Sequence, residues 1–144
     1  MKLRIICVGK AKEQGTKDWL AEFDKRLTKY ANVEWLELKE SSPVEEAKEL
    51  LAKVKDNEFC VVLDKGGKTF SSEAFADFLK KQTMQKDIIF IIGGPNGVIE
   101  DVRKRANLIL AFGSMTFSHQ VARLVLAEQL YRAFTIIKGE PYHK

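Results

Sequence analysis

Two glycine-containing segments, each directly after an apolar run, have the residue types needed to hold a ligand through the main chain. Gly93-Gly94-Pro95-Asn96-Gly97 follows Ile88–Ile92, and Gly113-Ser114-Met115-Thr116-Phe117 follows the apolar run 108–112. Glycine and asparagine tolerate positive φ, proline presets one turn position, and glycine lets a ligand approach closely. The first segment is neither G-x-G-x-x-G nor a P-loop. It favours an adenosine without phosphates over a dinucleotide or triphosphate, although both patterns are also typical of structural turns.

Two histidines, each close to a cationic residue, are candidates for proton transfer or RNA contact. His119 stands at the start of the predicted last helix, one turn before Arg123, and His143 lies between Tyr142 and Lys144. A histidine at a helix start is also commonly structural, and a chain terminus commonly frays. The proline and the aromatic residue before His143 nevertheless favour a tail that packs against the protein.

Several other kinds of site do not fit the sequence. Two histidines and the separated Cys7 and Cys60 cannot form a structural zinc site of usual spacing, so we expect no metal. There is no G-x-S-x-G nucleophile elbow, and Ser118 and His119 are neighbours rather than parts of a triad. Both cysteines lie in apolar runs, which indicates buried, reduced thiols of a cytoplasmic protein.

Predicted strands and helices alternate along the chain. We expect strands at residues 2–8, 33–38, 59–63, 88–92 and 108–112. Helices are expected from Thr16 or Asp18 to about residue 29, from the capping box at Ser42, from Ser71, in a short basic segment after residue 97, and from Ser118 to about Lys138. This order indicates an α/β fold with a mostly parallel sheet flanked by helices, as one domain spanning residues 1–144.

Three of the predicted strands are apolar throughout and end in loops, at residues 64–68, 93–97 and 113–117. Continuous apolar runs are typical of strands covered on both faces. Because parallel strands end at one edge of the sheet, the three loops should meet there, where ligands bind in such sheets. This edge is the candidate site.

The last helix is apolar on two opposite sides. One side carries Leu126, Leu130, Phe134 and Ile137, and the other carries Val121, Leu124, Val125 and Tyr131. A helix of this kind must be covered on both sides, and the final element has few neighbours left in its own chain. We therefore expect a two-fold homodimer. Glu128 and Arg132, four residues apart on the second side, form either a solvated pair or an interface or site pair.

The composition sets broad limits. The 144 residues are 45% hydrophobic and 31% charged, with a formal net charge of +4, as is ordinary for a soluble globular protein. The charge permits contact with nucleic acid without requiring it. No apolar run approaches the ~20 residues of a membrane span, and the first residues lead straight into a strand. We expect a soluble, cytoplasmic protein without a membrane partner.

Four motifs in this order resemble one family over essentially the whole chain. They are Ile92-Gly93-Gly94-Pro95-Asn96-Gly97, Phe112-Gly113-Ser114-Met115-Thr116-Phe117-Ser118-His119-Gln120, Glu128-Gln129-Leu130-Tyr131-Arg132-Ala133 and Pro141-Tyr142-His143-Lys144. Together they are similar to the RlmH family, small bacterial methyltransferases of the SPOUT class. Two departures are visible: Ser118 replaces the usual proline, and the segment between the second and third strands is shorter than in many relatives.

The resemblance implies a C-terminal trefoil knot over roughly residues 88–144, a homodimer, and S-adenosylmethionine bound in the knot. By position, the cofactor contacts fall on Leu63, Gly93, Phe112, Gly113, Ser114, Met115, Thr116 and Phe117. The implied reaction is methyl transfer to N3 of a pseudouridine in 23S ribosomal RNA, within the assembled ribosome.

The resemblance also suggests roles for the polar residues. His143 is the first candidate for orienting the target base or accepting its N3 proton, Tyr142 for stacking on a nucleobase, and Arg132 for contacting phosphate or the uracil carbonyls. His119, Arg123 and Lys144 are candidate RNA contacts.

Two rival functions remain open at the level of the sequence. One is a non-catalytic ribosome- or RNA-binding module of the same fold. The other is a small enzyme that binds a nucleotide phosphate through Lys65-Gly66-Gly67-Lys68.

Overall fold

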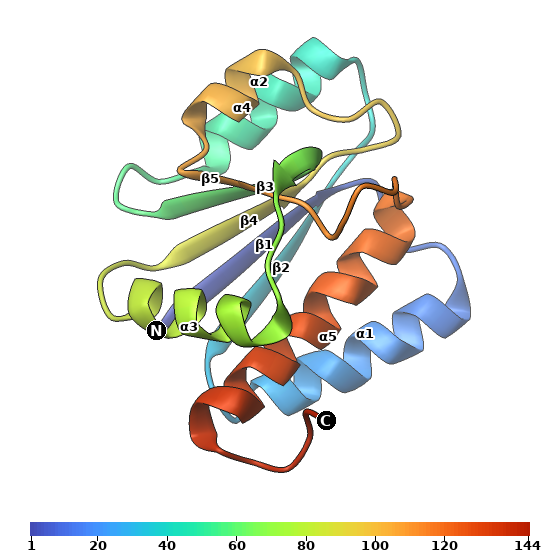
Figure 1. Cartoon of the computed structure of the whole chain (residues 1–144). Helices are drawn as coiled ribbons and strands as arrows, with labels where there is room; N and C mark the ends of the chain where they lie inside the picture. Colours follow the sequence, from blue (N-terminus) through green and yellow to red (C-terminus); the bar gives the residue numbers. More distant parts are fainter.

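The computed structural model describes residues 1–144, which form one five-stranded parallel sheet (Figure 1). The strands are β1 (Lys2–Val8), β2 (Asn32–Leu38), β3 (Phe59–Lys68), β4 (Ile88–Ile92) and β5 (Leu108–Leu110). Their order across the sheet is β2-β1-β4-β3-β5, and every neighbouring pair is parallel. The predicted α/β class with a parallel sheet is confirmed.

Helices cover both faces of the sheet. Helices α1 (Gln14–Leu27), α3 (Ser72–Thr83) and α5 (His119–Lys138) lie on one face, and α2 (Pro43–Lys53) and α4 (Glu100–Arg105) lie on the other (Figure 1). Strand β4 is central and buried along its whole length, with Phe90 facing the first layer and Ile89 and Ile91 facing the second. Double coverage explains why this strand is apolar at every position. None of the helices has the length and apolar character needed to cross a membrane.

Serine caps begin three of the helices. The hydroxyl oxygens of Ser42, Ser71 and Ser118 each accept a hydrogen bond from the main-chain N–H three residues later, at 3.2, 3.0 and 3.2 Å. Such caps pair main-chain donors that lack partners inside the helix. The three predicted helix starts are therefore confirmed, and Ser118 can replace a proline before α5 because it caps the helix.

Two local predictions for the helices were wrong. Helix α1 begins at Gln14 after Glu13, so neither Thr16 nor Asp18 is its cap, and Asp18 instead accepts a hydrogen bond from Gln14 at 2.8 Å. In the second helix, the helical spacing of Val44, Ala47, Leu51 and Val54 predicts that Val44 points inward, but Val44 is 55% exposed and Leu50 is buried in α2 instead. Packing against α4 and the sheet sets how α2 is rotated about its axis, and the spacing of apolar residues predicts this rotation only to within part of a turn.

The chain after Leu63 also differs from the prediction. Residues 64–68, expected as a loop, continue β3 after an irregularity, and Lys68 pairs with Leu110 of β5. Gly67 packs directly on β5, since a Cβ there would lie 2.6 Å from the carbonyl oxygen of Ile109. β5 itself stops at Leu110 rather than at residue 112. The Lys65–Lys68 segment is thus extended chain, which disfavours a phosphate-binding loop before a helix.

Candidate functional site

A cavity of about 740 Å³ lies at the carboxyl edge of the sheet, beside residues 63–65 of β3 and the ends of β4 and β5. Its walls come from this part of β3, from the segments around the ends of β4 and β5, and from the start of α5. The predicted meeting at one edge is therefore confirmed for the two glycine loops and for the first two residues of segment 64–68. The volume is in the range of sites that bind small molecules and cofactors.

Most of the residues predicted to contact a cofactor line this cavity. They are Leu63, Gly93, Phe112, Gly113, Met115, Thr116 and Phe117, and only Ser114 of the predicted set is absent from the wall. The wall also includes Asp64 and Lys65, the first residues of segment 64–68, which was expected at this edge but not among the cofactor contacts. Both residues lie in β3 directly after its apolar part, at the same edge as the glycine loops.

The first glycine loop turns back on itself. The N–H of Gly97 donates to the carbonyl of Gly94 at 2.9 Å, and Gly97 has a φ of +73°. A Cβ at Gly93 would lie 2.8 Å from Cγ1 of Val98 and 3.1 Å from the carbonyl of Gly97. The turn therefore requires glycine at position 93 for its own packing, whether or not a ligand also approaches the main chain there.

The second loop gives the cavity an apolar rim. The rings of Phe112 and Phe117 meet edge to face, with centroids 6.1 Å apart. Met115 is 79% exposed, and Phe117 is also exposed. Gly113, at a φ of +140°, has no protein atom within 4 Å of the position of a Cβ, so its backbone is open to a ligand. Apolar walls with open main-chain groups suit a flat heterocycle carrying polar edges.

His119 and Arg123 lie at the start of α5, in different surroundings. His119 lines the cavity, and the pKa of its imidazole is lowered, first by burial and then by the charge of Arg123, against the opposing effect of Glu40. Arg123 is only 1% exposed, and its guanidinium donates to a carboxylate oxygen of Glu37 at 2.9 Å and to the carbonyl of Gly9 at 3.2 Å. As an RNA contact, Arg123 would first have to break these bonds.

At the other end of α5, the C-terminal tail packs back on the helix. Glu128 accepts a hydrogen bond from Nε of Arg132 at 2.8 Å, which confirms the predicted i, i+4 pair. The guanidinium of Arg132 lies over the ring of Tyr142 at 4.9 Å, and that ring meets Tyr131 edge to face at 4.7 Å. The tail is therefore ordered by aromatic and cationic contacts.

His143 is bound through both ring nitrogens. Arg132 lies 3.0 Å from Nδ1, and an oxygen of Glu73 lies 2.6 Å from Nε2. Because a guanidinium can only donate, Nδ1 accepts and the ring proton is on Nε2, which donates to the carboxylate. This hydrogen bond is the main cause of the lowered pKa of Glu73.

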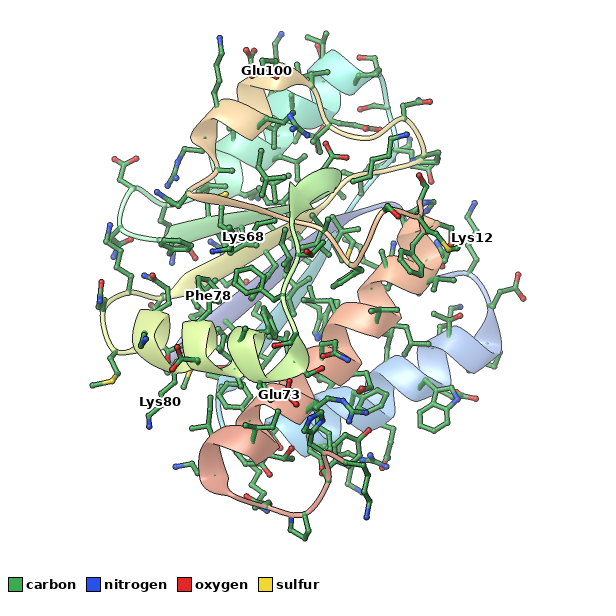
Figure 2. All side chains as sticks on the ribbon, viewed as in Figure 1. Lys12, Lys68, Glu73, Phe78, Lys80 and Glu100 are labelled. Atoms are coloured by element: carbon green, nitrogen blue, oxygen red, sulfur yellow. The ribbon has the colours of Figure 1, made fainter.

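The tail cluster and the cavity lie far apart in one chain. His119 and Arg132 are separated along α5 by about 20 Å at 1.5 Å of rise per residue. Figure 1 shows the C-terminus beside the far end of α5, away from the segment between β5 and α5, and Figure 2 shows Glu73 near that tail. The structure thus brings His143, Tyr142 and Arg132 together but does not place them at the cavity of their own chain.

The outer side of α5 is less covered than its inner side. Leu126, Leu130 and Phe134 are buried, whereas Val121 is 48% exposed. In the neighbouring helix α1, Trp19 is 53% exposed and stacks on Phe23. These apolar side chains are available to a partner surface.

The two cysteines offer no reactive thiolate. Cys7 and Cys60 are both unbonded and buried, and burial raises the pKa of each thiol to about 11. Both therefore remain protonated at neutral pH and serve as core residues.

Comparison with known proteins shows similarity along the full chain. Residues 1–143 match the model of a family described as predicted SPOUT methyltransferase. The chain is 43% identical to the ribosomal RNA large subunit methyltransferase H of Streptococcus gordonii, with all of both chains covered. It is 40% identical to the protein of the same name from Caldicellulosiruptor saccharolyticus, with 99% of each chain covered. The alignments are longer than 144 columns, so these relatives have residues without a counterpart here.

Solved structures with the same fold have little sequence in common with this chain. The SpoU methyltransferase AviRb from Streptomyces viridochromogenes is 12% identical, with a TM-score of 0.51. The match covers 96% of the present chain and 61% of that structure's chain. At this identity the likeness concerns the fold alone.

Proposed function

The chain belongs to the SPOUT methyltransferase family, and from that premise we propose that it methylates N3 of a pseudouridine in 23S ribosomal RNA, using S-adenosylmethionine, on assembled ribosomes in the cytoplasm. The observation that carries the proposal is the glycine-lined cavity at the carboxyl edge of the sheet, in a chain over 40% identical to a large-subunit ribosomal RNA methyltransferase. The trefoil knot over roughly residues 88–144 is part of the same proposal.

The cavity suits an adenosyl cofactor. Open main chain at Gly113 and the turn at Gly97 would hold its polar groups, and the rings of Phe112 and Phe117 would cover its base. When bound, S-adenosylmethionine supplies a methyl group activated by a positively charged sulfur. The chain contributes positioning, which suits a direct displacement at that methyl.

The second chemical requirement is removal of the N3 proton of the target base. We propose His143 for this step, with Arg132 and Tyr142 holding the base. In the docked tail, Nδ1 of His143 is occupied by Arg132 and Nε2 by Glu73, so the imidazole must leave this arrangement before it can accept a proton. The docked tail is then a resting position of the catalytic group.

A two-fold dimer explains how the tail reaches a cavity. If the outer sides of α5 pack in antiparallel fashion, the end of one helix lies beside the start of the other. The tail of each subunit would then approach the cavity of its partner, although it cannot reach the cavity of its own chain. The exposed Val121, close to the cavity end of α5, supports this arrangement.

We expect Val121→Glu to convert the protein from a homodimer to a monomer. A carboxylate on this side would have to lose its water of hydration in the interface without a cationic partner, which costs several kcal/mol. Light scattering should give twice the chain mass of 16.4 kDa for the wild type and the single mass for the variant. Val44→Glu, a similarly exposed position on the opposite layer, should remain dimeric. A wild-type monomer at micromolar concentration would remove the dimer from the proposal.

Cationic side chains near the cavity would contact RNA phosphates. Lys65 lines the wall, and Lys10 and Lys12 are held beside the start of α5. Lys144 is exposed at the tail and keeps its predicted role. His119 faces the cavity rather than the outer surface, and Arg123 is enclosed by Glu37, so neither is a surface contact in this state.

Mass spectrometry of ribosomal RNA tests the function directly. Cells lacking the protein should lose one methyl group from a pseudouridine of 23S RNA, and the purified protein should restore it on isolated 70S ribosomes. An unchanged methylation pattern would contradict the proposal.

Calorimetry separates the rivals, because binding of S-adenosylmethionine and S-adenosylhomocysteine but not ATP supports a methyltransferase. Binding that requires the phosphates of ATP supports a nucleotide enzyme, and no binding supports a non-catalytic module.

A further inference from the structure

The start of α5 is tied to the loop between β1 and α1. The side-chain nitrogen of Gln120 donates to the carbonyl of Lys10 at 2.6 Å, and its oxygen accepts from the N–H of Lys12 at 3.1 Å. Figure 2 shows Lys12 beside the first turn of α5. Because both main-chain groups have a fixed polarity, they determine which end of the Gln120 amide is nitrogen.

This orientation determines the state of His119. The amide nitrogen of Gln120 lies 3.1 Å from Nε2 of His119, and an amide NH₂ can only donate. Nε2 therefore accepts, and in the neutral ring the proton must be on Nδ1. The carboxylate of Glu40 is 3.8 Å from Nε2, too far to compete as a hydrogen-bond acceptor.

The charges around His119 favour the neutral ring. Arg123 donates from Nε to the main-chain carbonyl of His119 at 3.2 Å, one turn further along the helix. Arg123 and Lys12 disfavour a second positive charge, Glu40 favours it, and burial opposes it. The carboxylate of Glu37 is already bound to Arg123.

Nδ1 is the ring nitrogen left for a ligand. It has no hydrogen-bond partner in the protein, and no buried side-chain nitrogen or oxygen in the structure lacks one. Nδ1 is therefore accessible, and His119 lines the cavity.

We infer that Gln120 is a positioning residue that holds His119 as a neutral imidazole with its proton on Nδ1, presenting one hydrogen-bond donor to an acceptor atom of the adenosyl cofactor. The identity of the ligand rests on the proposed function, whereas the tautomer follows from the hydrogen bonds of Gln120 within the protein. This role differs from the RNA contact first considered for His119. Gln120 thus orients the hydrogen-bond donor of His119 although Gln120 itself does not line the cavity.

Nitrogen NMR tests the tautomer without any ligand. The chain has two histidines, so His143→Gln identifies the signals of His119 in a long-range ¹H–¹⁵N spectrum. The wild type should show a protonated Nδ1 and an unprotonated Nε2 at neutral pH. Gln120→Glu replaces the donor by an acceptor and should move the proton to Nε2, whereas Gln85→Glu, an exposed change of the same charge, should not. A wild-type proton on Nε2, or an unchanged tautomer in Gln120→Glu, would overturn the inference.

Titration with S-adenosylhomocysteine tests the donor. Losing one hydrogen bond should weaken binding about tenfold in Gln120→Glu and in His119→Gln. His119→Asn should bind more tightly than His119→Gln, because its amide nitrogen lies where Nδ1 was. If all three variants bind as the wild type does while the tautomer is as expected, the donor role is wrong and the proposed function stands. If the wild type binds no adenosyl ligand, the proposed function fails and, with it, the donor role.

Discussion

Removal of Tyr142, His143 and Lys144 should abolish methyl transfer to ribosomal RNA and leave most of the affinity for S-adenosylhomocysteine. The cavity contains no residue of the tail, so binding in the same chain should not depend on it. Loss of a general base alone costs about a hundredfold or more in rate. The assay is transfer of a labelled methyl group to 70S ribosomes, beside a calorimetric titration of the same variant.

The truncation should change stability little. The truncation removes the edge-to-face contact of Tyr142 with Tyr131, worth about 0.5–1.5 kcal/mol. It also removes the contacts of Arg132 with Tyr142 and His143 and the exposed pair of His143 and Glu73, each of which contributes little in water. Lys144→Ala is the matched control, and it should reduce only the salt-sensitive part of RNA binding. Wild-type turnover in the truncated protein would mean that the tail takes no part in the reaction.

Mixing two inactive variants tests whether the tail acts on the partner's cavity. A heterodimer pairs the truncated chain with a Gly93→Val chain. The intact cavity then belongs to the truncated chain, and the only tail belongs to the Gly93→Val chain. Activity should therefore return after subunit exchange. If the mixture stays inactive although mass spectrometry shows that heterodimers have formed, the tail must act within its own chain.

The second large effect is expected at Gly93, where Gly93→Val should remove detectable cofactor binding. The glycine pattern alone predicts that the valine obstructs the ligand directly and leaves the fold largely intact. The structure adds another cause, because the first side-chain atom would meet Val98 at 2.8 Å and the Gly97 carbonyl at 3.1 Å, so the loop itself must move. Such overpacking costs about 1–3 kcal/mol, which thermal unfolding will detect.

Gly15→Ala is the control for this substitution. Gly15 lies in α1 with no atom within 4 Å of a new Cβ, so alanine should leave binding intact and raise stability by about 0.5–1 kcal/mol. Calorimetry with S-adenosylhomocysteine measures both variants. Normal binding by Gly93→Val would mean that the first glycine loop is only a structural turn.

The sequence alone determined the features that depend on short stretches of chain. Ile88–Ile92 is apolar at every position because both faces are covered, and this pattern predicts the central strand correctly. Ser42 and Ser118 predict their helix starts because a cap needs only a hydroxyl and an N–H three residues later. Since parallel strands end at one edge, the order of apolar runs and glycine loops also predicted which segments line the cavity.

Only the tertiary structure decided where the polar side chains of α5 and the tail lie. Arg123 is as polar in sequence as any RNA contact, yet it is buried because Glu37, eighty-six residues earlier, supplies a carboxylate. The state of His119 depends on Gln120 and the main chain of Lys10 and Lys12, which no local pattern connects. Pairings of this kind form between elements distant in sequence. They depend on the angle at which one helix packs on a sheet, and periodicity does not fix that angle.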